Sequence, residues 1–325
     1  MKVFNAVLRM LAVGALLAIA GPVAAQQPYP IKPIRIIVAF SPGGAYDILA
    51  RLFGQKLTES WGQPVIVDNR PGGNTIIATE ALVKSPPDGY TIMLSSVTHV
   101  IIPSLLPLPF DAIKDFAPVA TVSSTRIVLT LHPLVPARNL QEFIALAKSR
   151  PGQLNFAAVG SGGSGHLAGE LFKVAAGISM QYIPYKGGAP AVADLMSGQV
   201  QLSFLGIINV VPHLKSGKLK AIAITGETRS SALPQVPTFA EAGLPGFDVN
   251  TWQAILAPAG TSKEIINKLS AEIARIATTP DSKAKLASQG AEPFTSSPEQ
   301  LAALMQADRV KYAELIKTAN IKIEH

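Results

Sequence analysis

The sequence predicts a protein of the α/β class, in which buried strands alternate with amphipathic helices over two lobes. Three observations support this prediction. The chain has 325 residues, which at about 150 residues per domain corresponds to roughly two domains. Hydrophobic residues make up 48% of it, enough for two buried cores. Short β-branched runs follow one another between stretches of helical period, and such runs are typical of mostly parallel sheets that are covered on both faces.

The first third of the chain contains three expected strands and two expected helices. The segment 34–40 is a nearly continuous β-branched run, and in the next segment Leu49, Leu52 and Phe53 fall on one helical stripe. A turn that contains Pro86, Pro87 and Gly89 leads into the third strand. The strands are expected at 34–40, 65–69 and 90–95, and the helices at 46–60 and 75–84.

The same alternation continues to the end of the chain. Strands are expected at 117–122, 127–131, 154–159, 181–185, 200–204, 219–225 and 251–257. Helices are expected at 140–149, 166–176, 190–196, 262–277 and 298–318. Pro151 and Gly152 end the first of these helices.

Two connections predict where the chain passes between lobes. The segment 230–247 contains three prolines and two glycines without a clear period, so it is interpreted as a long connection. With the segment 121–126 it forms a pair of crossings. We therefore expect a signal peptide at 1–25, the first part of lobe 1 at 26–124, lobe 2 at 125–249 and the C-terminal part of lobe 1 at 250–325.

The first 25 residues have the pattern of a secretory signal. Lys2 and Arg9 supply positive charge, 10–20 is apolar, and Val23, Ala24 and Ala25 form a small-residue cleavage site. The alternative is a buried N-terminal helix. Because the chain has no cysteine and hence no lipid anchor on an N-terminal Cys, the signal predicts a soluble protein of the periplasm.

Composition excludes several classes of function. Charged residues are only 15% of the chain, and the formal net charge of +7 is spread without a run of Lys or Arg, so we expect no nucleic-acid partner. The absence of cysteine excludes disulfides and thiolate metal sites. The five histidines are scattered without ligand spacing, which argues against any metal site.

Four diglycines carry the main functional hypothesis. Each follows an expected strand and precedes an expected helix, a place that corresponds to the ligand-binding edge of a parallel sheet. Backbone N–H groups at such helix starts bind carboxylates or phosphates without a buried Arg. Two pairs fall in each expected lobe, so they predict an anion-binding cleft, although each pair by itself is explained by a tight turn. The pairs are Gly43-Gly44, Gly72-Gly73, Gly162-Gly163 and Gly187-Gly188.

The third diglycine allows a rival interpretation. Gly160, Gly162 and Gly165 match the dinucleotide pattern G-x-G-x-x-G. The strand at 181–185 ends without the acidic residue that such sites use for the ribose, and the first acidic residue beyond it is Asp194. We therefore expect no cofactor. The loop suits a small carboxylate equally well.

Enzyme motifs are incomplete, and three neighbouring side chains have two interpretations each. Ser164-Gly165 continues into His166, so the nucleophile elbow G-x-S-x-G is not formed.

His166 either caps and packs or touches the ligand. Asp47 is expected to brace its loop in preference to direct contact. Tyr46 either forms a wall of the cleft or covers the lobe.

An ordered set of motifs resembles the Bug family, the periplasmic substrate-binding receptors of tripartite tricarboxylate transporters. The match extends over essentially the whole chain after the signal, and several long motifs in order are more specific than one glycine loop. The motifs include Phe40-x-Pro42-Gly43-Gly44-x-x-Asp47, Asp68-Asn69-Arg70-Pro71-Gly72, Pro184-Tyr185-Lys186-Gly187-Gly188-Ala189-Pro190 and Pro237-Thr238-x-x-Glu241-Ala242-Gly243.

The resemblance implies a periplasmic binding protein fold of type II, a Venus flytrap with a ligand cleft between its lobes. It implies a small organic acid as ligand, transporter membrane subunits as partners and no catalysis, and we expect a monomer. The ligand-binding residues expected from the glycine loops and from the family loops are Ser41, Gly43, Gly44, Ala45, Tyr46, Asp47, Ser95, Ser96, Ser161, Gly162, Gly163, Ser164, Tyr185, Gly187, Gly188, Ala189, Leu205 and Gly206.

Leu205 is a departure from the family, because many relatives have Asp after the residue that corresponds to Phe204. The absence of this Asp argues against an amino acid as the ligand and favours a less polar carboxylate ligand, aromatic or of medium chain length. Two other functions stay open at this point. One is an input protein for a signalling system that uses the same cleft, and the other is an enzyme on the same scaffold.

Overall fold

The strands form two separate sheets, which the computed structural model describes within residues 29–247, 249 and 251–322. The expected signal at 1–25 lies outside these residues. Contacts group the chain into residues 1–31 and residues 32–325. The strands and helices of both sheets all belong to the second unit.

The first sheet has six strands in the order β2-β1-β3-β10-β4-β11. β1 pairs in parallel with β2 and β3, whereas β10 is antiparallel to both β3 and β4, and β11 is antiparallel to β4. The strands are β1 (Ile34–Val38), β2 (Val65–Asn69), β3 (Thr91–Ser96), β4 (Phe116–Thr125), β10 (Thr251–Pro258) and β11 (Ala291–Pro293).

The second sheet has five strands in the order β7-β6-β8-β5-β9. β6 pairs in parallel with β7 and β8, and β5 is antiparallel to β8 and β9. The strands are β5 (Ile127–Leu131), β6 (Asn155–Val159), β7 (Gln181–Tyr185), β8 (Leu202–Gly206) and β9 (Lys220–Ile224).

Both sheets follow the same strand order, and this corrects one expectation. In each sheet a strand that arrives from the other sheet, β10 or β5, is inserted antiparallel beside the third parallel strand. The expectation of mostly parallel sheets was therefore wrong, because the sheets are mixed. A hydrophobic residue pattern indicates that a strand is buried on both faces, but it does not indicate the direction of that strand relative to its neighbours. β3, β5 and β10 are buried along their whole length, whereas the edge strands β2 and β7 are partly exposed.

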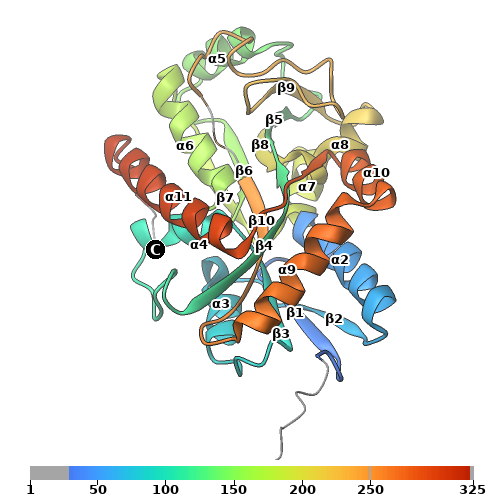
Figure 1. The fold of residues 1–325 in the computed structure, drawn as a ribbon. Helices are drawn as coiled ribbons and strands as arrows, with labels where there is room; N and C mark the ends of the chain where they lie inside the picture. Colours follow the sequence, from blue (N-terminus) through green and yellow to red (C-terminus); the bar gives the residue numbers. More distant parts are fainter. Residues whose placement is uncertain (1–28, 248, 250, 323–325) are drawn as a thin grey trace, which may run out of the picture. The chain divides into compact units, whose positions relative to one another are not determined.

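Helices α2, α3, α9 and α11 contact strands of the six-stranded sheet, and α6, α7 and α8 contact strands of the five-stranded sheet. The helices are α2 (Ala45–Trp61), α3 (Ile76–Val83), α4 (Thr98–Ile101), α5 (Leu140–Ser149), α6 (Ser164–Ala176), α7 (Gly188–Ser197), α8 (Ile207–Lys215), α9 (Lys263–Thr278), α10 (Pro280–Ser288) and α11 (Pro298–Thr318). Two 3₁₀ turns lie at Gly73–Thr75 and Ile102–Ser104. Figure 1 shows the C-terminal helices α9 and α11, in orange and red, beside β4.

The chain passes from the first sheet to the second at one residue. β4 runs on to Thr125 and β5 begins at Ile127, so only Arg126 lies between them. The expected crossing at 121–126 is thus mostly strand. The chain returns through the segment between β9 and β10. Because α9 and α11 contact β4, the C-terminal helices lie where the expected lobe boundaries need them, and those boundaries stay a prediction. None of the helices in the described part has the length and apolar character to cross a membrane.

Candidate functional site

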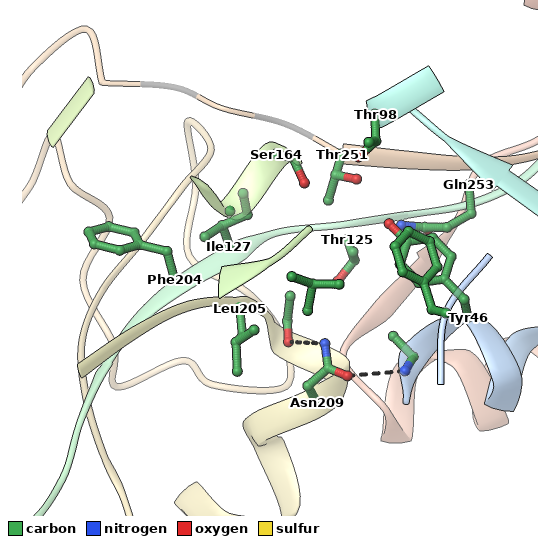
Figure 2. Close-up of a pocket in the computed structure, with 15 residues that line it drawn as sticks. Tyr46, Thr98, Thr125, Ile127, Ser164, Phe204, Leu205, Asn209, Thr251 and Gln253 are labelled. Carbon is green, nitrogen blue, oxygen red and sulfur yellow. Dashed lines mark hydrogen bonds between the residues drawn. The ribbon is translucent and has the colours of Figure 1, made fainter. Parts of the chain in front are cut away.

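A small cavity lies where residues of both sheets meet, and Figure 2 shows its lining. Its volume is about 40 Å³. A single water needs roughly 10–15 Å³ by the same kind of measure, so the cavity has room for a few waters and not for an organic acid. It is lined by Phe40, Ala45, Tyr46, Thr98, Thr125, Ile127, Val159, Ser164, Gly165, Phe204, Leu205, Gly206, Asn209, Thr251 and Gln253.

The start of α2 is held in place by Asp47. Gly43 has a positive φ of 78°, a conformation that favours glycine, and its N–H donates to Asp47 Oδ2 at 3.0 Å. Arg51 holds the same carboxylate through Nε at 3.0 Å and through an ion pair at 2.9 Å. Burial raises the pKa of Asp47, but hydrogen bonds from Arg51, Gly43 and Asn69 outweigh it, and the pKa is lowered. Asp47 thus braces the glycine loop, as its place in the first turn predicts.

The start of α6 is held by the same arrangement with a different side chain. The Gly162 N–H donates to His166 Nδ1 at 3.0 Å, four residues further on, and the His166 ring stacks on Tyr182 with 3.9 Å between centroids. Burial lowers the pKa of His166 to about 4, helped by the charge of Lys173. The ring is therefore neutral at pH 7 and accepts at Nδ1. His166 does not line this cavity, and the contacts it makes are those of capping and packing.

The cavity wall combines polar and apolar residues and carries no charged side chain among the described residues. None of the described residues that line it is Asp, Glu, Lys, Arg or His. Burial raises the pKa of the Tyr46 hydroxyl, and the polar side chains of Ser96, Thr251 and Gln253 offset only part of this rise, so Tyr46 remains a neutral donor. Figure 2 places the Tyr46 ring beside the Gln253 carboxamide. Such a wall offers hydroxyl, amide and backbone donors to an anion without a counter-charge.

Two buried hydroxyls in this wall, those of Thr125 and Thr251, lack a hydrogen-bond partner among the described residues. Thr125 is 6% exposed, and its Oγ1 makes no hydrogen bond to any described residue. The N–H groups of Ser164 and Gly165, at the first turn of α6, also have no acceptor inside the helix. The cavity therefore contains donors that a bound carboxylate could use.

Five of the expected ligand-binding residues line the cavity, namely Ala45, Tyr46, Ser164, Leu205 and Gly206. Ser161 and Tyr185 instead line a second cavity of about 280 Å³, which also contacts Phe40, Lys186 and the turn 72–75. Ser95 and Ser96 are buried in β3, where Ser96 Oγ accepts the N–H of Thr98. The remaining expected residues do not line the cavity, and their contact with a ligand stays a prediction.

Several of the expected residues bring the two sheets' loops together. The Ser41 N–H donates to the Lys186 carbonyl at 3.1 Å, and the Ser161 N–H donates to Asn74 Oδ1 at 3.1 Å. A Cβ on Gly187 would lie 2.9 Å from Ser41 Cβ. The glycines after β7 thus permit close approach of the α7 loop to the α2 loop, and some loop N–H groups expected to bind the ligand bond the opposite loop instead.

Sequence reasoning missed ten lining residues as site residues, although the family motifs named Phe40 and the segment 204–206. A signal was available for two of them. Thr251 and Gln253 alternate as polar residues in the otherwise apolar β10, which places them on the same face of the strand. The ten are Phe40, Thr98, Thr125, Ile127, Val159, Gly165, Phe204, Asn209, Thr251 and Gln253.

Comparisons with known proteins agree with the fold. A structure titled "R. palustris Rpa4515 with adipate" superposes with a TM-score of 0.88 and 32% identity, over 90% of this chain and 99% of that chain. MatC from Rhodopseudomonas palustris with bound malate gives 0.85 and 31%, over 89% and 100%. The periplasmic binding protein BugD gives 0.87 and 31%, over 91% and 100%. The α/β fold of periplasmic binding proteins is confirmed.

Sequence comparisons identify the family. Protein BugT of Bordetella pertussis is 38% identical over 323 residues, which cover 97% of this chain and 99% of the relative. The family model described as "Tripartite tricarboxylate transporter family receptor" matches residues 49–321. The family consists of receptors and not of enzymes, as the incomplete enzyme motifs indicated. This chain therefore belongs to the receptor family of the tripartite tricarboxylate transporters, the Bug proteins.

Proposed function

We propose that this protein is a periplasmic receptor that captures a small organic carboxylate between its two sheets and delivers it to the membrane subunits of a tripartite tricarboxylate-type transporter. The observation that carries this proposal is the uncharged cavity into which the starts of α2 and α6 converge from opposite sheets. Relatives bound to adipate and malate support a carboxylate as the ligand class.

Capture requires the two halves to separate first. The cavity has a volume of about 40 Å³, which is too small to hold an organic acid. For comparison, pockets that hold drug-sized ligands are typically about 300–1,000 Å³. The carboxylate therefore enters an open form and the halves close around it. Closure excludes water and strengthens each hydrogen bond to the charged group, roughly 1.5–3 kcal/mol apiece. The ligand shifts the open–closed equilibrium only through its preference for the closed form.

The wall also argues for the kind of acid. Leu205 is 2% exposed and lines the cavity with Phe40 and Phe204, and no acidic side chain of the described residues joins them. The ammonium group of an amino acid would be buried there without a counter-charge, which is costly. We therefore propose carboxylates that carry no amine, with an apolar portion against Phe40 and Phe204.

A thermal-shift and calorimetry panel tests the proposal. The panel contains mono-, di- and tricarboxylates, aromatic acids and amino acids, each added to the purified full chain after signal removal. A carboxylate present at one hundred times its Kd adds about 2.7 kcal/mol to stability. Binding of amino acids in preference to amine-free acids, or no binding of any organic anion, contradicts the proposal. Delivery is tested by carboxylate uptake into vesicles that contain the membrane subunits, with and without the receptor.

A further inference from the structure

Asn209 lies where the two halves meet at the cavity, and the inference drawn from it rests on the proposed function. It is the third residue of α8, on the five-stranded sheet. Its Oδ1 accepts the N–H of Ala45, the first residue of α2 on the six-stranded sheet, at 3.0 Å. Its Nδ2 donates to the carbonyl of Gly206 at 3.3 Å. Figure 2 draws both bonds at the edge of the cavity.

The oxygen of this carboxamide occupies a position that suits an anion better than an amide. Ala45 begins a helix of 17 residues, whose first N–H groups carry the positive end of the helix dipole. Gly188, the first residue of α7, lies against the same oxygen, since a Cβ on Gly188 would be 2.0 Å from Asn209 Oδ1. Two helix starts from opposite sheets thus converge on one oxygen that carries only a partial charge.

An independent observation points to a ligand-binding position beside the Asn209 carboxamide. The buried Thr125 Oγ1 has no hydrogen-bond partner among the described residues, and Thr125 lines the cavity beside Asn209. A Cβ on Gly206 would lie 3.8 Å from Thr125 Oγ1 and 3.6 Å from Asn209 Nδ2, so the hydroxyl and the carboxamide lie on the same side of Gly206. A buried hydroxyl without a partner is unfavourable, and a carboxylate oxygen there would accept its hydrogen bond.

We propose that the Asn209 carboxamide is a built-in competitor of the ligand. In the empty closed protein its oxygen takes the Ala45 N–H, and an incoming carboxylate displaces it and binds both that N–H and the Thr125 hydroxyl. A carboxylate gains more than an amide from these donors because its hydrogen bonds are charge-assisted. Asn209 thereby sets the affinity for carboxylates and holds the empty protein partly closed.

Substitutions that shorten the side chain or give it a charge act in opposite directions. Asn209→Ala frees the Ala45 N–H and enlarges the cavity. The probes are adipate, malate and benzoate. Each of these acids that binds the wild type is expected to bind the variant roughly fivefold more tightly, which corresponds to one net hydrogen bond. Asn209→Asp places a permanent carboxylate at the start of α2, and binding is expected to weaken at least tenfold. Asn209→Ser is a second variant too short to reach Ala45.

The control is Asn267→Ala, which replaces an exposed Asn in α9 far along the chain and is expected to change nothing. Small-angle scattering of the ligand-free proteins gives a second readout, in which Asn209→Ala is expected to be more open than the wild type. A complex structure provides the third readout, with a carboxylate oxygen in place of Oδ1 on the Ala45 N–H.

Each outcome decides the question. Weaker binding by both Asn209→Ala and Asn209→Ser, or unchanged binding by Asn209→Asp, overturns the inference while the wild-type titration still supports the proposed function. A complex in which Oδ1 keeps the Ala45 N–H overturns it as well. If the wild type binds none of the three acids, the proposed function fails for these acids and the inference fails with it.

Discussion

Asp47 and His166 perform the same local task on two helices with different chemistry. Each accepts the N–H of a glycine four residues earlier, Gly43 or Gly162, and each is buried. A carboxylate achieves this with the help of Arg51, whereas an imidazole does so only as the neutral ring. The two loops should therefore respond differently to pH and to substitution.

Replacing Asp47 is expected to loosen the start of α2. Asp47→Ala leaves the Gly43 N–H and the Arg51 guanidinium without their acceptor, and should lower the free energy of unfolding by about 1–3 kcal/mol at pH 7. Because the pKa of Asp47 is lowered by folding, this contribution is present above the ordinary Asp value near 4 and is lost as pH falls through the folded pKa.

Urea unfolding at pH 7 and at pH 3 measures both effects, and the difference between wild type and variant should shrink at the lower pH. Glu264→Ala removes another first-turn acid, an exposed one in α9, and serves as the matched control with little expected effect. A difference that persists unchanged at pH 3 contradicts the bracing role of the charged form.

His166 predicts a second, separate pH dependence. Its pKa falls from an ordinary 6.5 to about 4 in the folded protein, so the unfolded state binds more protons between these values. The stability from neutral His166 is fully present above pH 6.5 and is lost as pH falls toward 4, by up to about 3 kcal/mol. His99, buried against the Ala112 carbonyl, has its pKa lowered to about 4 and acts in the same direction.

His166→Gln should therefore flatten the decline of the unfolding free energy between pH 7 and 5 without abolishing it, because His99 remains. The measurement is urea unfolding at several pH values in that range. An equal slope in the wild type and in the variant would show that His166 is not neutral in the folded state.

At the scale of elements, the glycines at the helix starts fall into two kinds. A Cβ on Gly163 would lie 2.3 Å from the Val159 carbonyl oxygen, inside the same half of the protein. A Cβ on Gly187 would lie 2.9 Å from Ser41 Cβ, across the two sheets. The first glycine is needed for its own loop to fold, and the second for the two loops to approach.

Gly187→Ala is accordingly expected to weaken carboxylate binding by about tenfold with little loss of thermal stability, because its clash occurs only when the halves close. Gly187 has an extended φ of 177°, so an alanine there is not strained by its backbone. Gly163→Ala is expected to lower the melting temperature by several degrees, since about 1 kcal/mol shifts it by roughly 2–4 °C in a chain of 150–250 residues and a clash with a backbone oxygen costs more than that.

Calorimetric titration and thermal unfolding separate the two effects. Gly217→Ala is the control for introducing a methyl group, because nothing lies within 4 Å of its Cβ position, although its positive φ of 71° makes a small loss of stability the expected result. If Gly187→Ala lowers the melting temperature as strongly as Gly163→Ala, the contact between loops is not confined to the closed form.

At the scale of the whole molecule, Arg126 connects the segments that cross between the sheets. It is the one residue between β4 and β5, and its guanidinium donates to the Thr228 carbonyl and, at 3.3 Å, to Glu292 Oε1 of β11. A Cβ on Gly226 would lie 2.8 Å from the same guanidinium, so a glycine there leaves room for it. These bonds tie the first crossing to the second and to the C-terminal part of the first sheet.

Arg126→Ala is expected to favour the open form and to weaken carboxylate binding by roughly threefold to tenfold, since a hydrogen bond to a partly exposed partner contributes about 1 kcal/mol. Small-angle scattering without ligand and titration calorimetry measure the two changes. Lys220→Ala, which removes a cation bonded to the carbonyls of Val135 and Ala137 within one half, is the control for losing a partly buried cation. Tighter binding by Arg126→Ala would show that these bonds hold the protein open.

Elements with strong local signals could be predicted from the sequence to the residue. Strand β5 and helices α5 and α11 have the expected bounds, because Asn139 caps α5 and a capping box of Ser297 and Gln300 begins α11. Helix α8 was missed because Pro212 lies inside it, although its buried residues Ile207, Ile208, Val210 and Val211 follow a helical spacing. The three-residue strand β11 and the one-turn helix α4 carry too few residues for any pattern.

The order of the longer strands and of most helices, the glycine turns at the helix starts and the family were thus determined by the sequence alone, because each depends on neighbouring residues or on motifs in order. The tertiary structure decided the direction of β10, the cavity wall and the partners of the loop N–H groups. Thr125 and Thr251 share that wall although they lie far apart in the chain, and Ala45 bonds Asn209 from another sheet. A backbone N–H takes whichever acceptor folding brings near, and that acceptor can come from anywhere in the sequence.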